Sequence, residues 1–187
     1  MKETGARNVV RGGTLVSPRG RVLVFSFPDK EDKTMAHVSE EVRVDCPVSE
    51  VYNQWTQFEE FPRFMGAIEQ VQQKDDTHLH WKANIAGQTA EWDAEITEQV
   101  PDRVIAWQAT GGAQNQGRVQ FQPDGDATRV SLEMEVEPQG AVQSAGDLMG
   151  ALQSQVRQDL DRFKQLIESR GQASGEWRGE VHGGETQ

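Results

Sequence analysis

Two histidines are the side chains best suited to metal chemistry in this chain. His78 and His80 are two residues apart, so on a β-strand both would project from the same face. Two imidazoles can contribute to a metal site, but no cysteine or further histidine lies near them in the sequence, and His37 and His182 are at the chain ends. We therefore predict neither a bound metal nor a cofactor.

The carboxylates and hydroxyls show no catalytic pattern either. Glu91, Asp93 and Glu95 alternate along one predicted strand face, where we expect solvent to hydrate them, and acid–base catalysis would require a shifted pKa. Tyr52 is the one tyrosine and a candidate for moving protons. A nucleophile elbow, a P-loop, an HExxH motif and a CxxC motif are all absent from the sequence. We predict no catalytic residue.

Aromatic side chains are the most distinctive feature. One group, Trp55, Phe58, Phe61 and Phe64, surrounds Pro62, and we expect it to hold two short helices over the open end of a sheet.

A second group consists of three tryptophans on predicted strands. Trp81 and Trp92 alternate with polar residues, and Trp107 shares a strand face with Ile105, so all three belong to apolar strand faces. They either pack the core or line a ligand site. Because an indole is bulky, three of them would leave a small pocket rather than a lipid-sized tunnel.

Composition limits the partners and the compartment. The 187 residues carry a net charge of −11, with a pI near 4.8 and a mean hydropathy of −0.70. This charge argues against nucleic acid or an anionic membrane as the main partner. No apolar run approaches the roughly 18 residues of a membrane span. Cys46 is the one cysteine, so an intrachain disulfide cannot form, and we expect a cytoplasmic protein.

A long helix must organise the fold. Its apolar residues recur at intervals of three and four, which defines one helical stripe. These residues are Leu148, Leu152, Val156, Leu160, Phe163 and Ile167. The helix is predicted over residues 147–170, with Gly171 as its C-cap. Gly146 and Gly150 near its start indicate either close packing on a sheet or a flexible end.

The middle of the chain alternates apolar and polar residues in short runs separated by turn residues. These runs predict about seven antiparallel strands, over residues 37–45, 65–74, 78–86, 89–99, 103–110, 118–122 and 128–136. Two short helices fall after the first strand, before Pro62. The fold class is therefore α+β, with an antiparallel sheet curled around the C-terminal helix and an apolar cavity between them.

Both ends of the chain differ from this pattern. Residues 1–36 carry a formal charge of +3, against −14 for the remainder. Glycines and prolines interrupt their periodicity, so we predict a disordered basic tail, with Met35 as an alternative native start. Residues 171–187 are glycine-rich and are predicted as a second disordered tail, with Trp177 exposed. The folded domain is predicted over residues 37–170.

The order of elements resembles the helix-grip fold of the START-like (SRPBCC) superfamily. The segment VYNQWTQFEEFPRFM at 51–65 is similar to a signature of its polyketide cyclase/dehydrase and coenzyme Q-binding START-domain families. The segments LHW at 79–81, EWDAEI at 91–96 and IAW at 105–107 resemble a bacterial cyclase/dehydrase-type subfamily. The resemblance implies a hydrophobic cavity, with the 51–65 segment at one lip of its mouth. Superfamily members on this scaffold include lipid carriers, quinone binders, cyclases and partner-binding proteins.

The preferred function is binding or transport of a small apolar molecule, such as a lipid, a quinone or a polyketide-like aromatic, in the cavity between sheet and helix. Two alternatives stay open: a cyclase or dehydratase, and a protein-interaction domain with a filled core. The predicted ligand-binding residues are Trp55, Phe58, Phe61, Phe64, Trp81, Trp92, Trp107, Phe121, Met134, Leu148 and Leu152. Nucleic acid and stable membrane insertion are not expected, a protein partner is left open, and oligomeric state is not predicted.

Overall fold

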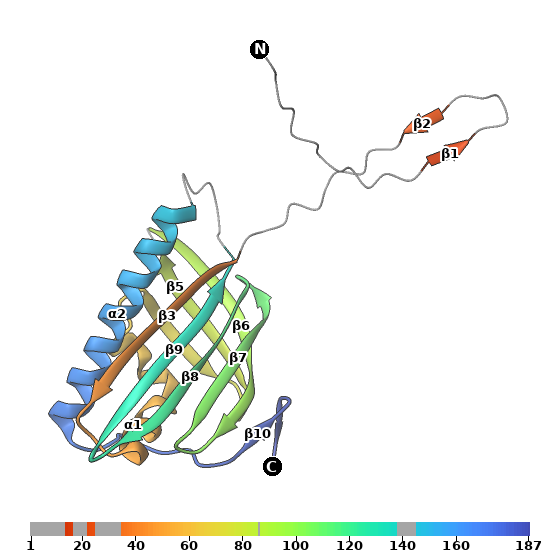
Figure 1. Ribbon diagram of the computed structural model, residues 1–187. Coiled ribbons are helices and arrows are strands. Elements are labelled where there is room, and N and C mark those ends of the chain that lie inside the picture. The colour runs from red at the N-terminus through yellow and green to blue at the C-terminus, as the bar shows by residue number, and fades with distance from the viewer. Residues whose placement is uncertain (1–13, 17–21, 25–34, 86, 138–144) are drawn as a thin grey trace. The chain divides into compact units, whose positions relative to one another are not determined.

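The computed structural model describes residues 14–16, 22–24, 35–85, 87–137 and 145–187 (Figure 1). It describes side chains from Met35 onward, except those of residues 145–148. The chain divides into two units, Met1–Lys33 and Thr34–Gln187, and each is described by itself.

The first unit contains a short β-ladder. Strands β1 (Thr14–Val16) and β2 (Val22–Val24) pair antiparallel, with Leu15 opposite Leu23. The prediction of a disordered tail is therefore wrong for these two segments, which are rich in residues that favour strands. The other residues of this tail up to 34 lie outside the described part of the chain.

The second unit contains the seven predicted strands in one antiparallel sheet. They are β3 (Ala36–Val44), β4 (Ile68–Gln73), β5 (His78–Ile85), β6 (Gln88–Val100), β7 (Val104–Gly112), β8 (Asn115–Asp124) and β9 (Ala127–Val136). The sheet runs in the order β6-β7-β8-β9-β3, and β4 and β5 continue it from β6. Short hairpins join neighbouring strands, as the alternating runs and turn residues predict.

A bulge in β6 changes which residues face inward. The register of β6 on β7 shifts between Ile96 and Glu98. Ile96 and Gln99 are consequently both buried although they are three residues apart, a spacing that a regular strand would not allow. The extra residue brings a buried amide to a position that strict alternation assigns to the outer face.

Three helices complete the unit. Helix α1 (Val48–Trp55) and the 3₁₀ helix η1 (Phe58–Arg63) follow β3, and α2 (Ala145–Arg170) comes after β9. Figure 1 shows α2 along β3 at one side of the curled sheet. Its predicted stripe is buried from Val156 to Ile167, and Gly171 ends the helix with φ 70°. The antiparallel sheet with a C-terminal helix confirms the predicted helix-grip architecture.

The C-terminal segment 171–187 is ordered against this unit, which corrects the prediction of a disordered tail. Strand β10 (Val181–His182) pairs with β6, and β11 (Glu185–Thr186) pairs with β10. Val181 is fully buried, and Trp177 packs on the core rather than being freely exposed. A strand of two residues is too short to show a periodic pattern, so its contacts with β6 could not be read from the sequence.

Over the described residues, no helix combines the length and apolar character that crossing a bilayer requires.

Candidate functional site at the open end of the grip

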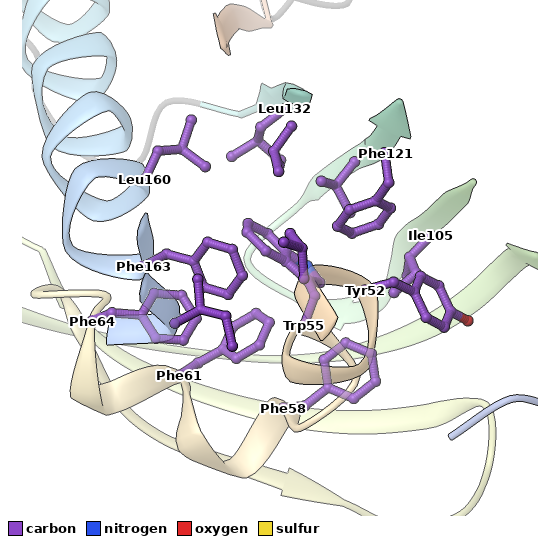
Figure 2. Close-up of a cluster of buried hydrophobic side chains, with 14 of the residues drawn as sticks. Tyr52, Trp55, Phe58, Phe61, Phe64, Ile105, Phe121, Leu132, Leu160 and Phe163 are labelled. Atoms are coloured by element: carbon purple, nitrogen blue, oxygen red, sulfur yellow. The ribbon is translucent and has the colours of Figure 1, made fainter. Parts of the chain in front are cut away.

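The end of the grip near α1 is filled by an aromatic cluster. This lower aromatic cluster consists of Trp55, Phe58, Phe61, Phe64, Phe121 and Phe163, all of them at most 5% exposed (Figure 2). The ring centroids of Trp55 and Phe163 are 4.7 Å apart, and those of Phe61 and Phe64 are 4.9 Å apart. Five of the predicted ligand-binding residues thus contact one another in the packed core, and their rings occupy the space that a ligand would need.

Inward-facing residues at the other end keep part of their surface exposed. We call this group the upper set; its members are Trp81, Trp92, Trp107, Met134 and Leu152. Trp107, Met134 and Leu152 pack against the edge of the core without being enclosed by it. The upper set includes five more of the predicted ligand-binding residues. The eleventh, Leu148, lies in α2, but its side chain is outside the described part of the structure.

Cross-strand pairing places two indoles of the upper set face to face. Trp81 on β5 is directly opposite Trp92 on β6. Their rings are nearly parallel, with an interplanar angle of 3° and centroids 5.8 Å apart. Trp81 also contacts the lower aromatic cluster, because its ring lies 5.5 Å from that of Phe61. The pair is therefore a stack of two flat rings that lies beside the filled end.

Trp107 is held in place by a hydrogen bond and by a glycine. Its Nε1 donates to Asn115 Oδ1 at 3.1 Å. Gly117 on β8 lies opposite Trp107, and a Cβ there would come within 2.6 Å of the indole ring. Gly117 is thus required for the close approach of this ring.

Glu40 is a charged residue on the inner face that the sequence pattern placed among valines. Its side chain is 8% exposed, and both of its oxygens accept hydrogen bonds from Arg157 of α2, at 3.0 and 3.1 Å. These hydrogen bonds lower the pKa of Glu40, which keeps it ionised. Glu40 therefore ties α2 to the edge strand β3 and is not poised to exchange protons.

Helix α2 is anchored mainly along its C-terminal two thirds. Arg162 donates to Phe64 O at 2.7 Å, and Asp159 accepts from Gly66 N at 3.0 Å. Nearer the start, Met149 and Gly150 are exposed, and a Cβ on Gly150 would meet no atom within 4 Å. Close packing against the described residues therefore does not explain Gly150.

Tyr52, the candidate proton carrier, does not belong to the upper set. It is fully buried beside Phe121, and its hydroxyl accepts a hydrogen bond from Gln99 Nε2 at 3.0 Å. Burial raises the pKa of Tyr52 to about 12. Arg178 of the C-terminal segment covers the ring at 5.7 Å from its centroid. Sequence reasoning did not identify Gln99 or Arg178 as its partners, because one depends on the bulge and the other on the path of residues 171–187.

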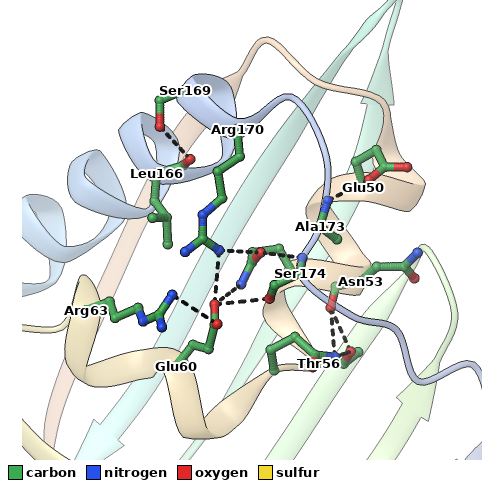
Figure 3. Close-up of polar contacts among 12 residues, drawn as sticks. Glu50, Asn53, Thr56, Glu60, Arg63, Leu166, Ser169, Arg170, Ala173 and Ser174 are labelled. Atoms are coloured by element: carbon green, nitrogen blue, oxygen red, sulfur yellow. Dashed lines mark hydrogen bonds and ion pairs between the residues drawn. The ribbon is translucent and has the colours of Figure 1, made fainter.

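A polar network closes the lower end over α1 (Figure 3). Glu60 accepts hydrogen bonds from Arg170, Gln54 and Ser174, each at 3.0 Å. Burial opposes ionisation of Glu60, but these hydrogen bonds outweigh it and lower its pKa. Glu50 accepts from the amide of Ala173 at 2.7 Å. These contacts hold the end of α2 and the following segment against the two short helices.

The predicted metal candidates lie away from the upper set, on the outer face of the sheet. His78 Nδ1 is 2.9 Å from Asp75, and His80 Nδ1 is 3.0 Å from Asp93. In the part of the chain that the structure describes, no group of three or more histidine, cysteine or carboxylate side chains could hold a metal ion. Both histidines take part in ordinary surface pairs.

Two hollows are found outside the grip. One, of about 280 Å³, is lined mostly by outward-facing residues of β6 to β9, including Glu98, Arg118 and Glu133. The other, of about 300 Å³, lies beside α2 at Gly150 and Arg157. Trp107 and Met134 of the upper set also contribute to the lining of the first hollow, whereas the second contains no member of this set.

The architecture and the exposed inner face define a helix-grip protein. The family model for polyketide cyclase / dehydrase and lipid transport matches residues 44–164. The chain is 46% identical over 149 residues to an uncharacterized 17.2 kDa protein of Streptomyces lincolnensis from the melC2-rnhH intergenic region, which covers 79% of this chain and 99% of that protein. The chain therefore belongs to the polyketide cyclase/dehydrase and lipid transport family.

Solved structures share the fold. The Zhui aromatase/cyclase from a Streptomyces species superposes with a TM-score of 0.61 at 18% identity, covering 77% of this chain and 100% of that one. A START superfamily protein from Mycobacterium smegmatis gives a TM-score of 0.57 at 17% identity, with 73% and 97% covered. A protein from Deinococcus radiodurans gives 0.58 at 26% identity, with 72% and 98% covered. These likenesses show that the chain shares the fold of these proteins.

Proposed function

We propose that this protein binds a small apolar molecule on the upper set and acts as a binding or carrier protein. The observation that carries the proposal is the contrast in exposure along one sheet face. Residues at the α1 end are enclosed, whereas Trp81, Trp92 and Trp107 face inward and remain partly exposed. Indoles that are left partly uncovered on a concave face are typical of a ligand surface.

The chemistry of the upper set favours an apolar ligand. Its five members are apolar or indole side chains, and the inward carboxylate nearest to α2, Glu40, is neutralised by Arg157. Covering apolar surface stabilises a complex by about 25 cal/mol per Å². The candidate ligands are a quinone, a polyketide-like aromatic or a lipid, and ring-shaped molecules match the flat rings of Trp81 and Trp92 best.

Two other functions predict different results. A cyclase or dehydratase activity is suggested by the family and by the aromatase/cyclase neighbour, but Tyr52 is sealed under Arg178 at the other end of the grip. An interaction domain with a filled core is suggested by the lower aromatic cluster. We also propose that the protein acts in the cytoplasm, where free apolar metabolites need a carrier.

Native mass spectrometry tests the proposal. Protein purified without detergent would be mixed with a quinone, a flat aromatic ketone and a fatty acid, and the bound masses recorded. We expect a one-to-one complex with at least one of them, which Trp92→Ala weakens about tenfold and the outer-face variant Gln108→Ala leaves unchanged. Absence of any bound mass would argue for the interaction domain, and equal binding by both variants would mean that the ligand binds outside the upper set. Conversion of a bound polyketide would argue for the enzyme.

A further inference from the structure

Two indole N–H groups on the same inner face differ in whether they have a hydrogen-bond acceptor. The N–H of Trp107 is satisfied by Asn115 Oδ1 at 3.1 Å. The Nε1 atom of Trp81 is buried and has no hydrogen-bond partner among the described residues. Both tryptophans pack on the edge of the same core, so the difference is local to their polar atoms.

An unpaired buried donor is unusual and calls for a physical reason. Most buried polar atoms in proteins have a partner, and an indole N–H that leaves water without gaining one destabilises the fold. A phenylalanine would fill most of the same space without this cost. The presence of tryptophan at position 81 is explained if its N–H acquires an acceptor in another state of the protein.

The surroundings of Trp81 define what that acceptor can be. The ring lies between Phe61, at 5.5 Å, and Trp92, which is stacked on it at 5.8 Å. The cross-strand neighbour on β4 is Val71, which is buried. Among the described residues, the cation–π contact that is found involves Arg178 and Tyr52, so no cation that would favour a carboxylate or a phosphate is found at this indole. A neutral oxygen on a flat, apolar molecule fits this setting, because it adds a hydrogen bond without bringing an uncompensated charge into an apolar site.

We propose that Trp81 is the specificity-determining residue of the site, and that its Nε1–H donates a hydrogen bond to a carbonyl oxygen of a flat aromatic ligand. The inference rests on the proposed function and narrows it to ring ketones and quinones over plain hydrocarbons and acyl chains. In the complex the acceptor oxygen would lie about 2.9 Å from Nε1. The ring of the ligand would lie against the stack of Trp81 and Trp92.

The experiment compares 9-fluorenone with fluorene, two flat molecules of the same shape that differ by one carbonyl group. In ¹H–¹⁵N spectra of the wild-type protein, each indole N–H gives its own signal, and triple-resonance experiments assign that of Trp81. We expect fluorenone to move the Trp81 signal downfield, because a hydrogen bond deshields the proton, and fluorene not to do so. This readout does not depend on whether any variant folds.

Binding constants from equilibrium dialysis provide a second readout. Trp81→Phe should lower the preference for fluorenone over fluorene by roughly three- to tenfold, the range expected for one hydrogen bond, because the smaller ring weakens the apolar contact with both compounds alike. The control Trp177→Phe removes an indole N–H from the C-terminal segment and should change neither constant.

The outcomes separate this inference from the proposed function. If both compounds bind with equal affinity and have the same effect on the Trp81 signal, Trp81 is not the hydrogen-bond donor. The proposal that the upper set binds apolar molecules would be unaffected by this result. If neither flat compound binds while a fatty acid does, carriage of apolar molecules stands and the ring-ketone class is wrong. If none of the three binds, both proposals are wrong.

Discussion

The sheet face that α2 covers carries aromatic residues at both of its ends, but these residues are packed differently at the two ends. At the α1 end, Trp55 is 3% exposed and is surrounded by four phenylalanine rings whose centroids lie within about 6 Å of its own. At the other end, Trp92 is partly exposed, and among the described aromatic residues its ring stacks on Trp81. Aromatic content alone therefore does not identify a ligand site. Rings on which few elements converge stay partly exposed, and these are the candidates for ligand contact.

The difference has a structural cause. Helices α1 and η1, the C-terminal half of α2 and segment 171–187 all converge on one end, and hydrogen bonds such as Arg170 to Glu60 hold them there. At the other end the sheet faces the first turns of α2, where Gly150 is exposed. A stability core and a binding surface can thus occupy one continuous sheet face. The following predictions test this division, beginning with the largest expected effect.

Removing a ring from the lower aromatic cluster should cost most. Phe163→Ala deletes a fully buried side chain whose ring centroid lies 4.7 Å from that of Trp55 and 5.2 Å from that of Phe64. We expect a loss of about 3–5 kcal/mol in the free energy of unfolding, measured by urea denaturation. Met149→Ala, at an exposed position, should change it by less than about 0.5 kcal/mol. Equal effects of the two variants would show that this end is not packed as described.

Releasing the C-terminal segment should have an intermediate effect. Arg178 binds both carboxylate oxygens of Asp102, at 2.7 and 3.1 Å, and Asn53 Oδ1 at 2.8 Å. Because its side chain is 37% exposed, solvent screening limits the effect of Arg178→Ala to about 1–2 kcal/mol. Hydrogen exchange should accelerate at Val181.

A matched control for Arg178 is available on the outer face. Arg118→Ala breaks an exposed ion pair with Glu98 in which the charged atoms are 3.8 Å apart. It should leave exchange at Val181 unchanged. Unaltered exchange in Arg178→Ala would mean that β10 is held by its strand pairing and by burial of Val181 rather than by this arginine.

Trp92→Ala should be tolerated far better than a change in the lower aromatic cluster. The side chain is partly exposed, and its stacking on Trp81 corresponds to a cross-strand aromatic pair, which contributes up to about 1 kcal/mol. Urea denaturation of Trp92→Ala and Trp55→Ala gives the direct comparison, with about 3–5 kcal/mol expected for the latter. A loss of 3 kcal/mol or more for Trp92 would make the upper set part of the core and remove the basis of the ligand proposal.

The smallest effect is expected on the pH dependence of stability, through protonation of Glu60 in acid. The pKa of Glu60 is lowered in the folded protein from the usual 4.5. As the pH falls below about 4.5, this carboxylate therefore binds a proton more readily in the unfolded chain than in the folded one. The contribution of Glu60 is therefore complete above about pH 4.5 and is lost as pH falls through the folded pKa. Unfolding measured across this range should show a shallower decline for Glu60→Gln. An identical slope in both proteins would mean that Arg170 and Gln54 do not stabilise the charged form.

Much of the fold could be predicted because its signals are local. The stripe of α2 and the alternation in β5, β6 and β9 reflect periodicities of one element, and these elements were found within a few residues of their predicted bounds. Gln99 could not be placed, because a bulge depends on the partner strand. The ordered path of 171–187 was likewise missed, because Arg178 and Val181 are stabilised by residues far away in the sequence.

Sequence determined the class of protein, the helix at its centre and the aromatic side chains that line the inner face. Tertiary structure alone decided that Phe61 and Phe64 fill the grip while Trp81 and Trp92 border its open end. It also decided that Trp107 has a hydrogen-bond acceptor, whereas Trp81 has none within the described part of the chain. The reason is that periodicity specifies the face to which a side chain belongs, whereas enclosure and hydrogen bonding depend on which distant elements converge on it.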